Sequence, residues 1–381
     1  MQVPDNPFEP RHFEDVRKPL DQASTMPPWV YTSDKFFQRE VDRIFMKVWN
    51  FMGHVDQVPN PGDYVALEFV GVPFIICRND NGDLCAYANS CRHRGSKVAI
   101  GSGNVKEFMC PYHGWCYGLD GRLTATVDMD QTTGFYKQDY GLIPINIDTW
   151  GGFIFVNFDP DFESLADYLG DLPTNLASHK LTDMANVRTV EWELNHNWKL
   201  FVENAKESYH IAIVHRETIN QVAPVKSADY SVSDAAGQYC TTFANHDGSM
   251  ALLKDDLGFP PIETLKGRYR HGTYAPMIYP MSYLACTIDS AWFLQLFPIG
   301  PNKTKLVHGA CFPRDRTVRP DFEELAANYY KRWDRTILED IEAGDHQQVG
   351  IASPFARPGR FCFREPLVHQ IDNWILNRVL D

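Results

Sequence analysis

The sequence of 381 residues predicts an α+β protein built from an all-β unit and a larger mixed unit. From about residue 49 to residue 158 the chain consists of short β-rich runs separated by Gly and Asn/Asp turn signals, which supply the positive-φ conformations that hairpin turns need. After residue 159 strand-like runs mix with helical patterns, and one long helix is predicted from about 321 to 347. A chain of this length is expected to form two domains.

The individual elements follow in chain order. The first 30 residues are rich in proline and predict an extended arm, and Ser33 is expected to cap a helix whose apolar residues recur at spacings of three and four. Strands of the all-β unit are predicted in the runs DYVALEFV, VPFIICR, LCAYANSC and GGFIFVNF. The mixed unit is predicted to contain a helix over 198–216, strands in SYLACTIDSAWFLQLFPIG and KTKLVHGACF, and a C-terminal helix in EPLVHQIDNWILNRVL.

The composition argues against several classes of protein. A net charge of −13 gives no sequence-wide attraction for nucleic acid or for a membrane surface. No apolar run approaches the ~18–20 residues that cross a bilayer, and the N-terminus lacks the apolar segment of a secretory signal. The nine cysteines are therefore expected to be mostly reduced. These features predict a cytoplasmic globular protein.

Two short motifs carry the first candidate metal site. Residues 91–95 read CRHRG and residues 110–116 read CPYHGWC, so that Cys91 and His93 form one pair, and Cys110 and His113 a second. Each pair offers one thiolate and one imidazole on a turn that contains glycine. This donor set fits a [2Fe–2S] centre with two cysteines on one iron and two histidines on the other.

Other interpretations of these four residues stay open at this point. They are also a donor set for structural zinc, although zinc motifs usually place both cysteines in one pair and both histidines in the other. Alternatively, the four residues belong to the core and bind no metal. A further alternative is that the chain is a small electron carrier, but it is about three times too long for that role. Cys116 lies outside the pattern and is expected to serve packing.

A second candidate metal site lies in the mixed unit. His210 and His215 are five residues apart, which on a regular helix places them roughly 140° apart. Both can reach one metal only if the helix is distorted or ends near His215. Taken alone the pair is weak evidence, because helical histidines are commonly core or surface residues.

Asp340 strengthens this second site. It falls inside the apolar stripe of the long predicted helix, whereas Glu339 points roughly 100° away from it; the stripe comprises Phe322, Ala326, Tyr329, Tyr330, Trp333, Ile337 and Ile341. A lone buried carboxylate costs several kcal/mol unless it is paired or binds a cation. Two histidines and one carboxylate form the triad of non-haem Fe(II) oxygenases, with a structural salt bridge as the alternative.

Two more residues are candidates near this site. Glu207 lies one turn before His210, where a carboxylate orients a metal-bound imidazole, or where it is simply solvated. Asn204 is expected either to line the space for oxygen or substrate, or to serve ordinary helix packing.

The two constellations, in this order, resemble the oxygenase α subunit of the Rieske non-haem iron oxygenases, the family that includes naphthalene dioxygenase. The resemblance covers nearly the whole chain: the two Cys-His motifs, the run NWKLFVENAKESYHIAIVH, and the Glu-Asp pair at 339–340. It implies an N-terminal arm and helix over 1–45 packing with the catalytic domain, an all-β Rieske [2Fe–2S] domain over 46–158, and a catalytic domain over 159–381. It implies for the catalytic domain a helix-grip (START/Bet v 1-like) fold with a central antiparallel sheet.

The resemblance also implies cofactors and site residues. Cys91 and Cys110 would hold one cluster iron, and His93 and His113 the other; His210, His215 and Asp340 would hold a mononuclear Fe(II). It implies a homotrimer, in which Glu207 contacts His210 of its own chain and His113 of the next. The acidic bridge is usually aspartate in this family, and glutamate resembles the branch that oxidises carnitine and related quaternary ammonium compounds.

The activity implied is that of a terminal oxygenase. A flavin reductase, directly or through a ferredoxin, would pass electrons from NAD(P)H for the reduction of O₂. Monohydroxylation of a small organic substrate, with N- or O-dealkylation, is the preferred outcome, and cis-dihydroxylation of an aromatic ring is the alternative. A zinc-stabilised binding protein is the alternative of another class.

The substrate pocket is expected between residues 216 and 310. The apolar candidates are Met250, Leu253, Phe259, Tyr279, Met281, Tyr283, Phe293 and Phe297. In the sequence no Arg or Lys stands out as a clamp for a substrate carboxylate.

Overall fold

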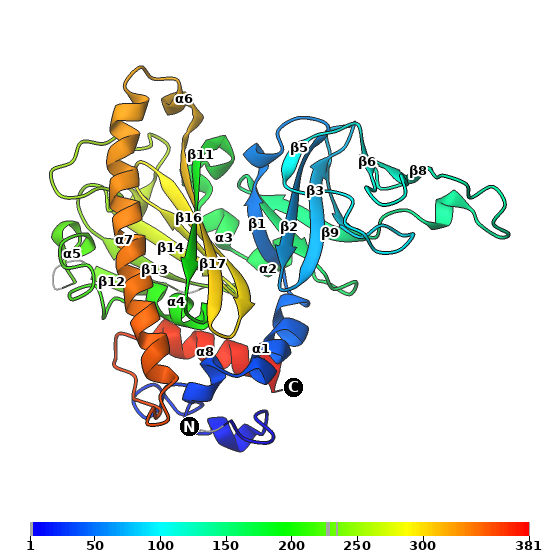
Figure 1. Cartoon of the computed structure of the whole chain (residues 1–381). Coiled ribbons are helices and arrows are strands. Elements are labelled where there is room, and N and C mark those ends of the chain that lie inside the picture. Colours follow the sequence, from blue (N-terminus) through cyan, green and yellow to red (C-terminus); the bar gives the residue numbers. More distant parts are fainter. Residues whose placement is uncertain (1–2, 226–228, 234, 381) are drawn as a thin grey trace. The chain divides into compact units, whose positions relative to one another are not determined.

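The computed structural model describes residues 3–225, 229–233 and 235–380 and divides into two compact units (Figure 1). The smaller unit is Lys47–Leu165. The larger unit combines the residues up to Met46 with those from Ala166 onward. Within the described ranges every helix is too short or too polar to traverse a bilayer.

The smaller unit is an all-β structure of two antiparallel sheets. One sheet has the strand order β1-β10-β9-β4-β3-β2-β5 and the other the order β6-β7-β8. The strands are β1 (Asn50–His54), β2 (Asp63–Phe69), β3 (Val72–Arg78), β4 (Leu84–Ala88), β5 (Ser102–Asn104), β6 (Glu107–Met109), β7 (Cys116–Gly118), β8 (Leu123–Ala125), β9 (Pro144–Trp150) and β10 (Phe153–Asn157). The β-rich runs predicted from the sequence are confirmed.

The larger unit is built on one antiparallel sheet of order β11-β17-β16-β15-β14-β13-β12. The strands are β11 (Met184–Leu194), β12 (Asp229–Ser233), β13 (Tyr239–Asn245), β14 (Gly272–Ile278), β15 (Ser282–Cys286), β16 (Ala291–Gly300) and β17 (Lys303–Pro313). The described helices are α1 (Asp34–Glu40), α2 (Leu165–Leu169), α3 (Leu172–Asn175), α4 (Trp198–Ala205), α5 (Ile219–Val222), α6 (Arg314–Thr317), α7 (Phe322–Ile351) and α8 (Pro366–Val379). Single turns of this unit are η1 (Pro10–Phe13), η2 (Pro28–Tyr31), η3 (Val41–Phe45), η6 (Ala177–His179), η7 (Leu181–Asp183) and η8 (Gly267–Arg270); η4 (Val55–Gln57) and η5 (Lys137–Asp139) belong to the smaller unit.

Helix α7 lies across one face of this sheet (Figure 1). Its apolar stripe is buried, and the Trp333 ring packs against Trp292 of β16 at 5.4 Å and against His308 of β17 at 5.4 Å between centroids. A long helix held against an antiparallel sheet is the α+β arrangement that the sequence predicted for this part of the chain, and that prediction is confirmed.

The helix predicted over 198–216 is too long. α4 ends at Ala205, and the chain continues through successive turns that carry both histidines of the second candidate site. The carboxylate of Glu207 accepts hydrogen bonds from the N–H groups of Tyr209 and His210. A side chain that takes up backbone donors in this way competes with helix continuation.

The N-terminal arm belongs to the larger unit. Arg17 donates to the side chains of Asn373 and Asn377 on α8, and Ser24 forms a β-bridge with Arg360. Ser33 caps α1, as predicted, because its Oγ accepts a hydrogen bond from the N–H of Phe36 at 3.2 Å.

A buried ion pair joins α1 to α4. Lys199 Nζ lies 2.7 Å from Glu40 Oε1, the Trp198 indole N–H donates to Glu40 Oε2 at 3.1 Å, and both charged side chains are fully buried. Because α4 leads directly into the second candidate site, this pair fixes the position from which the site is built.

We expect Lys199→Met to lower the free energy of unfolding by about 3–5 kcal/mol, because it leaves the Glu40 carboxylate buried without its cation. Urea unfolding followed by tryptophan fluorescence measures the change. Lys303→Met, which removes a half-exposed partner of Glu193, should change the value by at most about 1 kcal/mol. The double variant Glu40→Gln/Lys199→Met should recover part of the loss, and no recovery would contradict the pairing argument.

Candidate metal centres and substrate cavity

The two Cys-His motifs form a matched pair of loops in the smaller unit. In the first, the N–H of Gly95 donates to the carbonyl of Cys91 at 2.8 Å; in the second, the N–H of Gly114 donates to the carbonyl of Cys110 at 3.0 Å. The φ angles of the two glycines are +78° and +70°, a region that favours glycine. The repeated geometry explains why each motif has a glycine four residues after its cysteine.

The donors of the two loops are arranged asymmetrically. Cys91 and Cys110 are buried in the core of the smaller unit. His93 and His113 lie outward, with their Nδ1 atoms 3.1 Å apart, and the His93 ring stacks on Trp115. Two buried thiols and two convergent imidazole nitrogens form a donor set that fits a [2Fe–2S] cluster with mixed ligands.

Local hydrogen bonds favour the thiolate form of Cys110. Burial opposes ionisation of Cys110, yet the N–H groups of Tyr112 and His113 and the side chain of Cys91 lower the pKa of its thiol. The hydroxyl of Tyr117 lies 3.2 Å from Cys91 Sγ. Donors directed at cysteine sulfur also tune the potential of a bound cluster. All nine cysteines of the chain are free, and Cys116 is buried beside these loops.

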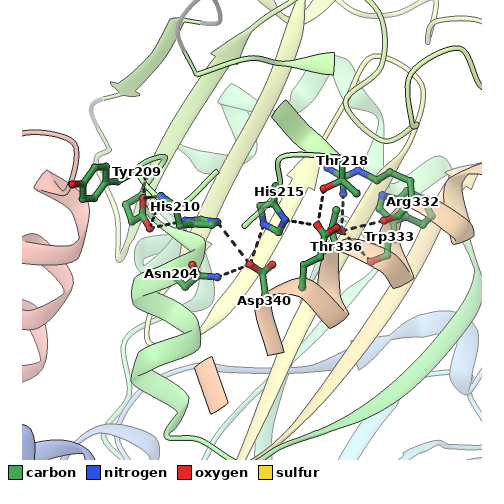
Figure 2. A network of polar contacts seen from close by, with 11 residues as sticks. Asn204, Tyr209, His210, His215, Thr218, Arg332, Trp333, Thr336 and Asp340 are labelled. Carbon is green, nitrogen blue, oxygen red and sulfur yellow. Dashed lines mark hydrogen bonds and ion pairs between the residues drawn. The ribbon is translucent and has the colours of Figure 1, made fainter. Parts of the chain in front are cut away.

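The second candidate site is brought together from two elements of the larger unit. One ligand atom each of His210, His215 and Asp340 lies within 4.8 Å of the others. His210 Nε2 is 3.7 Å and His215 Nε2 is 3.0 Å from Asp340 Oδ1 (Figure 2). Two imidazoles and a carboxylate in this compact arrangement fit a mononuclear Fe(II) site with open positions.

Because the segment after α4 is not a regular helix, the side chains of His210 and His215 can face the same point although the two residues are five positions apart. The carbonyl of His210 accepts hydrogen bonds from the N–H groups of Ile213 and Val214, both at 2.9 Å, in a segment outside regular helix. The two imidazole rings therefore meet with centroids 5.0 Å apart. On a regular helix they would point to different faces.

Carboxylates fix the orientation of both imidazoles. His210 Nδ1 is 2.5 Å from Glu207 Oε1, and His215 Nδ1 is 2.8 Å from Glu339 Oε2. Each ring consequently presents Nε2 to Asp340, which is how outer carboxylates hold metal-bound histidines. Burial alone lowers the pKa of His215, but Asp340 and Glu339 raise that pKa to about 9.

Asn204 contacts the proposed ligand carboxylate. Its Nδ2 donates to Asp340 Oδ1 at 2.7 Å and it lines the cavity beside the site (Figure 2). The amide therefore holds one oxygen of Asp340, which orients the carboxylate.

Sequence reasoning missed Glu339. The rotation of about 100° that separates it from Asp340 directs it to the outer nitrogen of His215 and to the hydroxyl of Thr218, 2.6 Å away. The sequence signal for Glu339 was a pair of adjacent acidic residues on one predicted helix, of which one lies in the apolar stripe and the other beside it.

A cavity of about 250 Å³ opens beside these residues. Of the eight apolar candidates, Met250 and Tyr283 line it; the other six do not belong to its described lining, and two of them pack elsewhere, Phe259 on Tyr329 and Tyr279 on Trp374. The expectation of a pocket built from 216–310 is wrong in part, because α7 and residues 363–367 also contribute. Three basic residues, Lys206, Arg332 and Arg364, also line the cavity.

Comparison with known families agrees with this pair of sites. The family described as "Ring hydroxylating alpha subunit (catalytic domain)" matches residues 181–381, and "Rieske [2Fe-2S] domain" matches residues 48–137. The two matches together define a two-centre non-haem iron oxygenase. The chain belongs to the family of Rieske ring-hydroxylating α subunits.

Similar proteins include oxygenases of nitrogen compounds. A chloroplastic choline monooxygenase of Beta vulgaris is 33% identical, with 96% of this chain and 79% of that protein covered. The glycine betaine monooxygenase oxygenase subunit of Pseudomonas aeruginosa is 26% identical, with 99% and 94% covered.

Solved structures show the same fold. A quaternary ammonium Rieske monooxygenase studied for carnitine oxidation by gut microbiota aligns with a TM-score of 0.82 at 22% identity, covering 94% of this chain and 96% of that one. Naphthalene 1,2-dioxygenase from Rhodococcus sp. aligns with a TM-score of 0.80 at 21% identity, covering 100% and 99%.

Family membership establishes the class of activity. The protein is an oxidoreductase, a terminal oxygenase that takes electrons from a reductase or ferredoxin to activate O₂ and hydroxylate a small substrate. Its cofactors are a Rieske [2Fe–2S] cluster and a mononuclear iron. The alternative of a zinc-stabilised binding protein does not hold for a member of this family.

We expect Glu339→Ala to weaken iron binding about 10–100-fold, because His215 loses the carboxylate that fixes its ring. Metal analysis after dialysis against a graded series of chelator concentrations measures the affinity. Glu342→Ala removes an exposed carboxylate from the same helix and should behave as wild type. Equal iron retention by both variants would show that Glu339 does not position His215.

Proposed function

We propose that the protein is a monooxygenase that hydroxylates a C–H bond next to nitrogen in a small N-alkylated substrate, with loss of the alkyl group. The observation that carries this proposal is the convergence of His210, His215 and Asp340 beside a cavity, with both imidazoles held from behind by carboxylates. The relatives are named for choline and glycine betaine, and a similar structure is described for carnitine oxidation, so the names favour a small N-alkylated substrate.

The residues have distinct roles in this proposal. His210, His215 and Asp340 hold the mononuclear iron, and Cys91 and Cys110 with His93 and His113 hold the cluster. The iron supplies activation of O₂, and the cluster supplies electrons one at a time. Glu207 orients His210, and Asn204 orients Asp340.

The reductase supplies the two electrons that balance the overall reaction. One oxygen atom enters the C–H bond, and the other leaves as water with two electrons and two protons. When the carbon is an N-methyl group, the N-hydroxymethyl product breaks at the C–N bond. The bonding pair stays on nitrogen, the hydroxyl proton passes to solvent, and formaldehyde is released.

We also propose that the active form is a homotrimer in which Glu207 of one subunit contacts His113 of its neighbour. The supporting observations are the short contact between Glu207 and His210 and the outward position of His113 on its loop. Such a contact would let electrons pass between the two centres of neighbouring chains. The domain roles assigned to 1–45, 46–158 and 159–381 and the cytoplasmic location stay predictions.

Product analysis with a surrogate ferredoxin and reductase tests the activity. The panel contains N-methyl, O-methyl and plain aromatic compounds, and the readouts are formaldehyde release and hydroxylated product. Formaldehyde from an N-methyl compound supports the proposal. A cis-dihydrodiol from an aromatic compound as the preferred product would replace it with the dioxygenase alternative.

Asp340→Ala should abolish binding of mononuclear iron while the visible absorption of the cluster stays unchanged, because the two sets of ligands lie in separate units. Iron and acid-labile sulfide analysis give the stoichiometry. A variant that retains its full iron content would show that another carboxylate is the ligand.

Glu207→Gln should leave both metal sites occupied but slow oxidation of the reduced cluster by O₂ and substrate about 10–100-fold, because the amide no longer carries the charge that holds His210. Stopped-flow absorbance in a single turnover measures the rate. Glu217→Gln alters an exposed carboxylate nearby and should react at the wild-type rate. A Glu207→Gln rate equal to this control would remove Glu207 from the electron path.

A further inference from the structure

The start of helix α8 forms one wall of the cavity. Four residues at the beginning of this helix and just before it line the cavity: Phe363, Arg364, Pro366 and Leu367. The helix packs against α4 and α1 (Figure 1). Helix α4 carries Asn204, which holds the carboxylate of Asp340. The attachment of α8 to α4 therefore affects the cavity wall next to the proposed iron site.

Asp372 is the one acidic residue of α8, and only 1% of it is exposed. Within the described ranges no donor reaches either oxygen of its carboxyl group. Its polar neighbour on α4 is the carboxyl group of Glu203, which lies within hydrogen-bonding reach. Two ionised carboxylates cannot form a hydrogen bond with each other, because both are acceptors only. The contact is satisfied when one of the two groups carries a proton.

The described residues around this pair contain more acids than bases. The ammonium group of Lys199 is near the pair, but it already forms the buried ion pair with Glu40 at 2.7 Å. Glu365, which precedes α8, adds a further negative charge, and the hydroxyl of Tyr31 donates to Glu203 Oε1 at 2.9 Å. A second ionised carboxylate here would be a buried charge without a cation of its own, which is unfavourable.

The pKa values of the two acids are shifted in the same direction. Burial raises the pKa of Asp372 well above its usual range, and the nearby charge of Glu203 raises it further. Burial also raises the pKa of Glu203 to about 7, although the hydroxyl of Tyr31 and the charge of Lys199 lower it. Because both values lie above those of exposed carboxyl groups, the packing of α8 against α4 takes up protons.

We propose that Asp372 is a positioning residue that keeps its proton at neutral pH and donates a hydrogen bond to Glu203, which holds α8 and the cavity wall against α4. A hydrogen bond from a carboxylic acid to a carboxylate is stronger than one between neutral groups. Loss of the proton leaves two negative groups facing each other, so that α8 separates from α4 and the wall at 363–367 loosens. This inference does not depend on the identity of the substrate.

The direction of the pH dependence follows from the raised pKa values. The stabilisation of the packed helix is complete below the usual pKa values of 3.8 and 4.5, at which the two groups are protonated even when they are exposed. It is lost as the pH rises through about 7 and above. Uptake of one proton lowers the equilibrium constant for packing by up to about tenfold per pH unit.

Infrared difference spectroscopy at pH 7 tests for the proton directly and does not need an active enzyme. We expect the wild-type protein to show the C=O stretching band of a protonated carboxylic acid, and Asp372→Asn to lack it. Glu342→Gln changes an exposed carboxylate on α7 and should keep the band. A wild-type protein without the band would show that Asp372 is ionised and would overturn the proposal.

Hydrogen exchange measured by mass spectrometry tests the packing of α8. Peptides from 366–379 are compared at equal pH between 6 and 9, so that the intrinsic exchange rate cancels. Protection in the wild-type protein should fall by up to about tenfold per pH unit. Asp372→Asn, whose amide donates without titrating, should stay protected throughout, and Asp372→Ala should be poorly protected at every pH.

Two exchange results would contradict the proposal. One is an equal dependence on pH in the wild-type protein and in Asp372→Asn. The other is a loss of protection in Asp372→Asn as large as that in Asp372→Ala, which would mean that the negative charge itself holds the helix. If Asp372→Ala does not fold, the comparison of the wild-type protein with Asp372→Asn and the infrared band decide.

Steady-state kinetics test the connection to the cavity with any compound that is turned over. The KM of the wild-type protein should rise relative to that of Asp372→Asn between pH 7 and 9, while the ratio of the two kcat values stays constant. A constant ratio of the KM values would contradict the link between α8 and the cavity. The absence of formaldehyde from every N-methyl compound would contradict the proposed function instead, and the infrared and exchange results would still decide the role of Asp372.

Discussion

The contact between the turns that follow α4 and the middle of α7 is the constraint on which the site depends. It joins residues more than a hundred positions apart through the bonds from Asn204 and His215 to Asp340 and from His215 to Glu339. The sheet supports α7 from behind through Trp333, and the buried pair of Lys199 and Glu40 holds α4. Small errors in either element would separate the histidines from the carboxylate, so the rigid packing of the larger unit is a requirement of the chemistry.

The sequence predicted those features that depend on local spacing. The strands of the smaller unit, the capped helix after Ser33 and the two Cys-His loops all follow from patterns within about twenty residues, and rotation along one helix was enough to single out Asp340. The end of α4 at Ala205 was missed because it depends on a side chain, Glu207, that takes up backbone donors. The cavity lining was missed because it depends on which helix covers the sheet, and a search confined to 216–310 could not include Arg332 on α7.

The two Cys-His loops place the four proposed cluster ligands in two different environments. The buried cysteines lie in the core of the smaller unit, where desolvation raises the cost of added charge, whereas the histidines lie at its edge. An electron that reaches such a centre has its shortest way out through the imidazole side. The position of the histidines on their loops therefore decides which surface another centre has to approach, and this geometry gives the proposed contact with Glu207 of a neighbouring subunit its physical basis.

More basic than acidic side chains line the cavity, whereas the chain as a whole has a net charge of −13. The two sets of charges act on a ligand over different distances. The net charge of −13 acts mainly through exposed groups, and salt screens such groups beyond a Debye length of about 8 Å at physiological ionic strength. Lys206 and Arg332 are buried, so solvent screens them far less and a ligand inside the cavity experiences them directly. The acidic composition argues against nucleic acid and anionic membranes as partners, but it does not determine the charge of the substrate, because buried side chains of both signs line the cavity in which a ligand would bind.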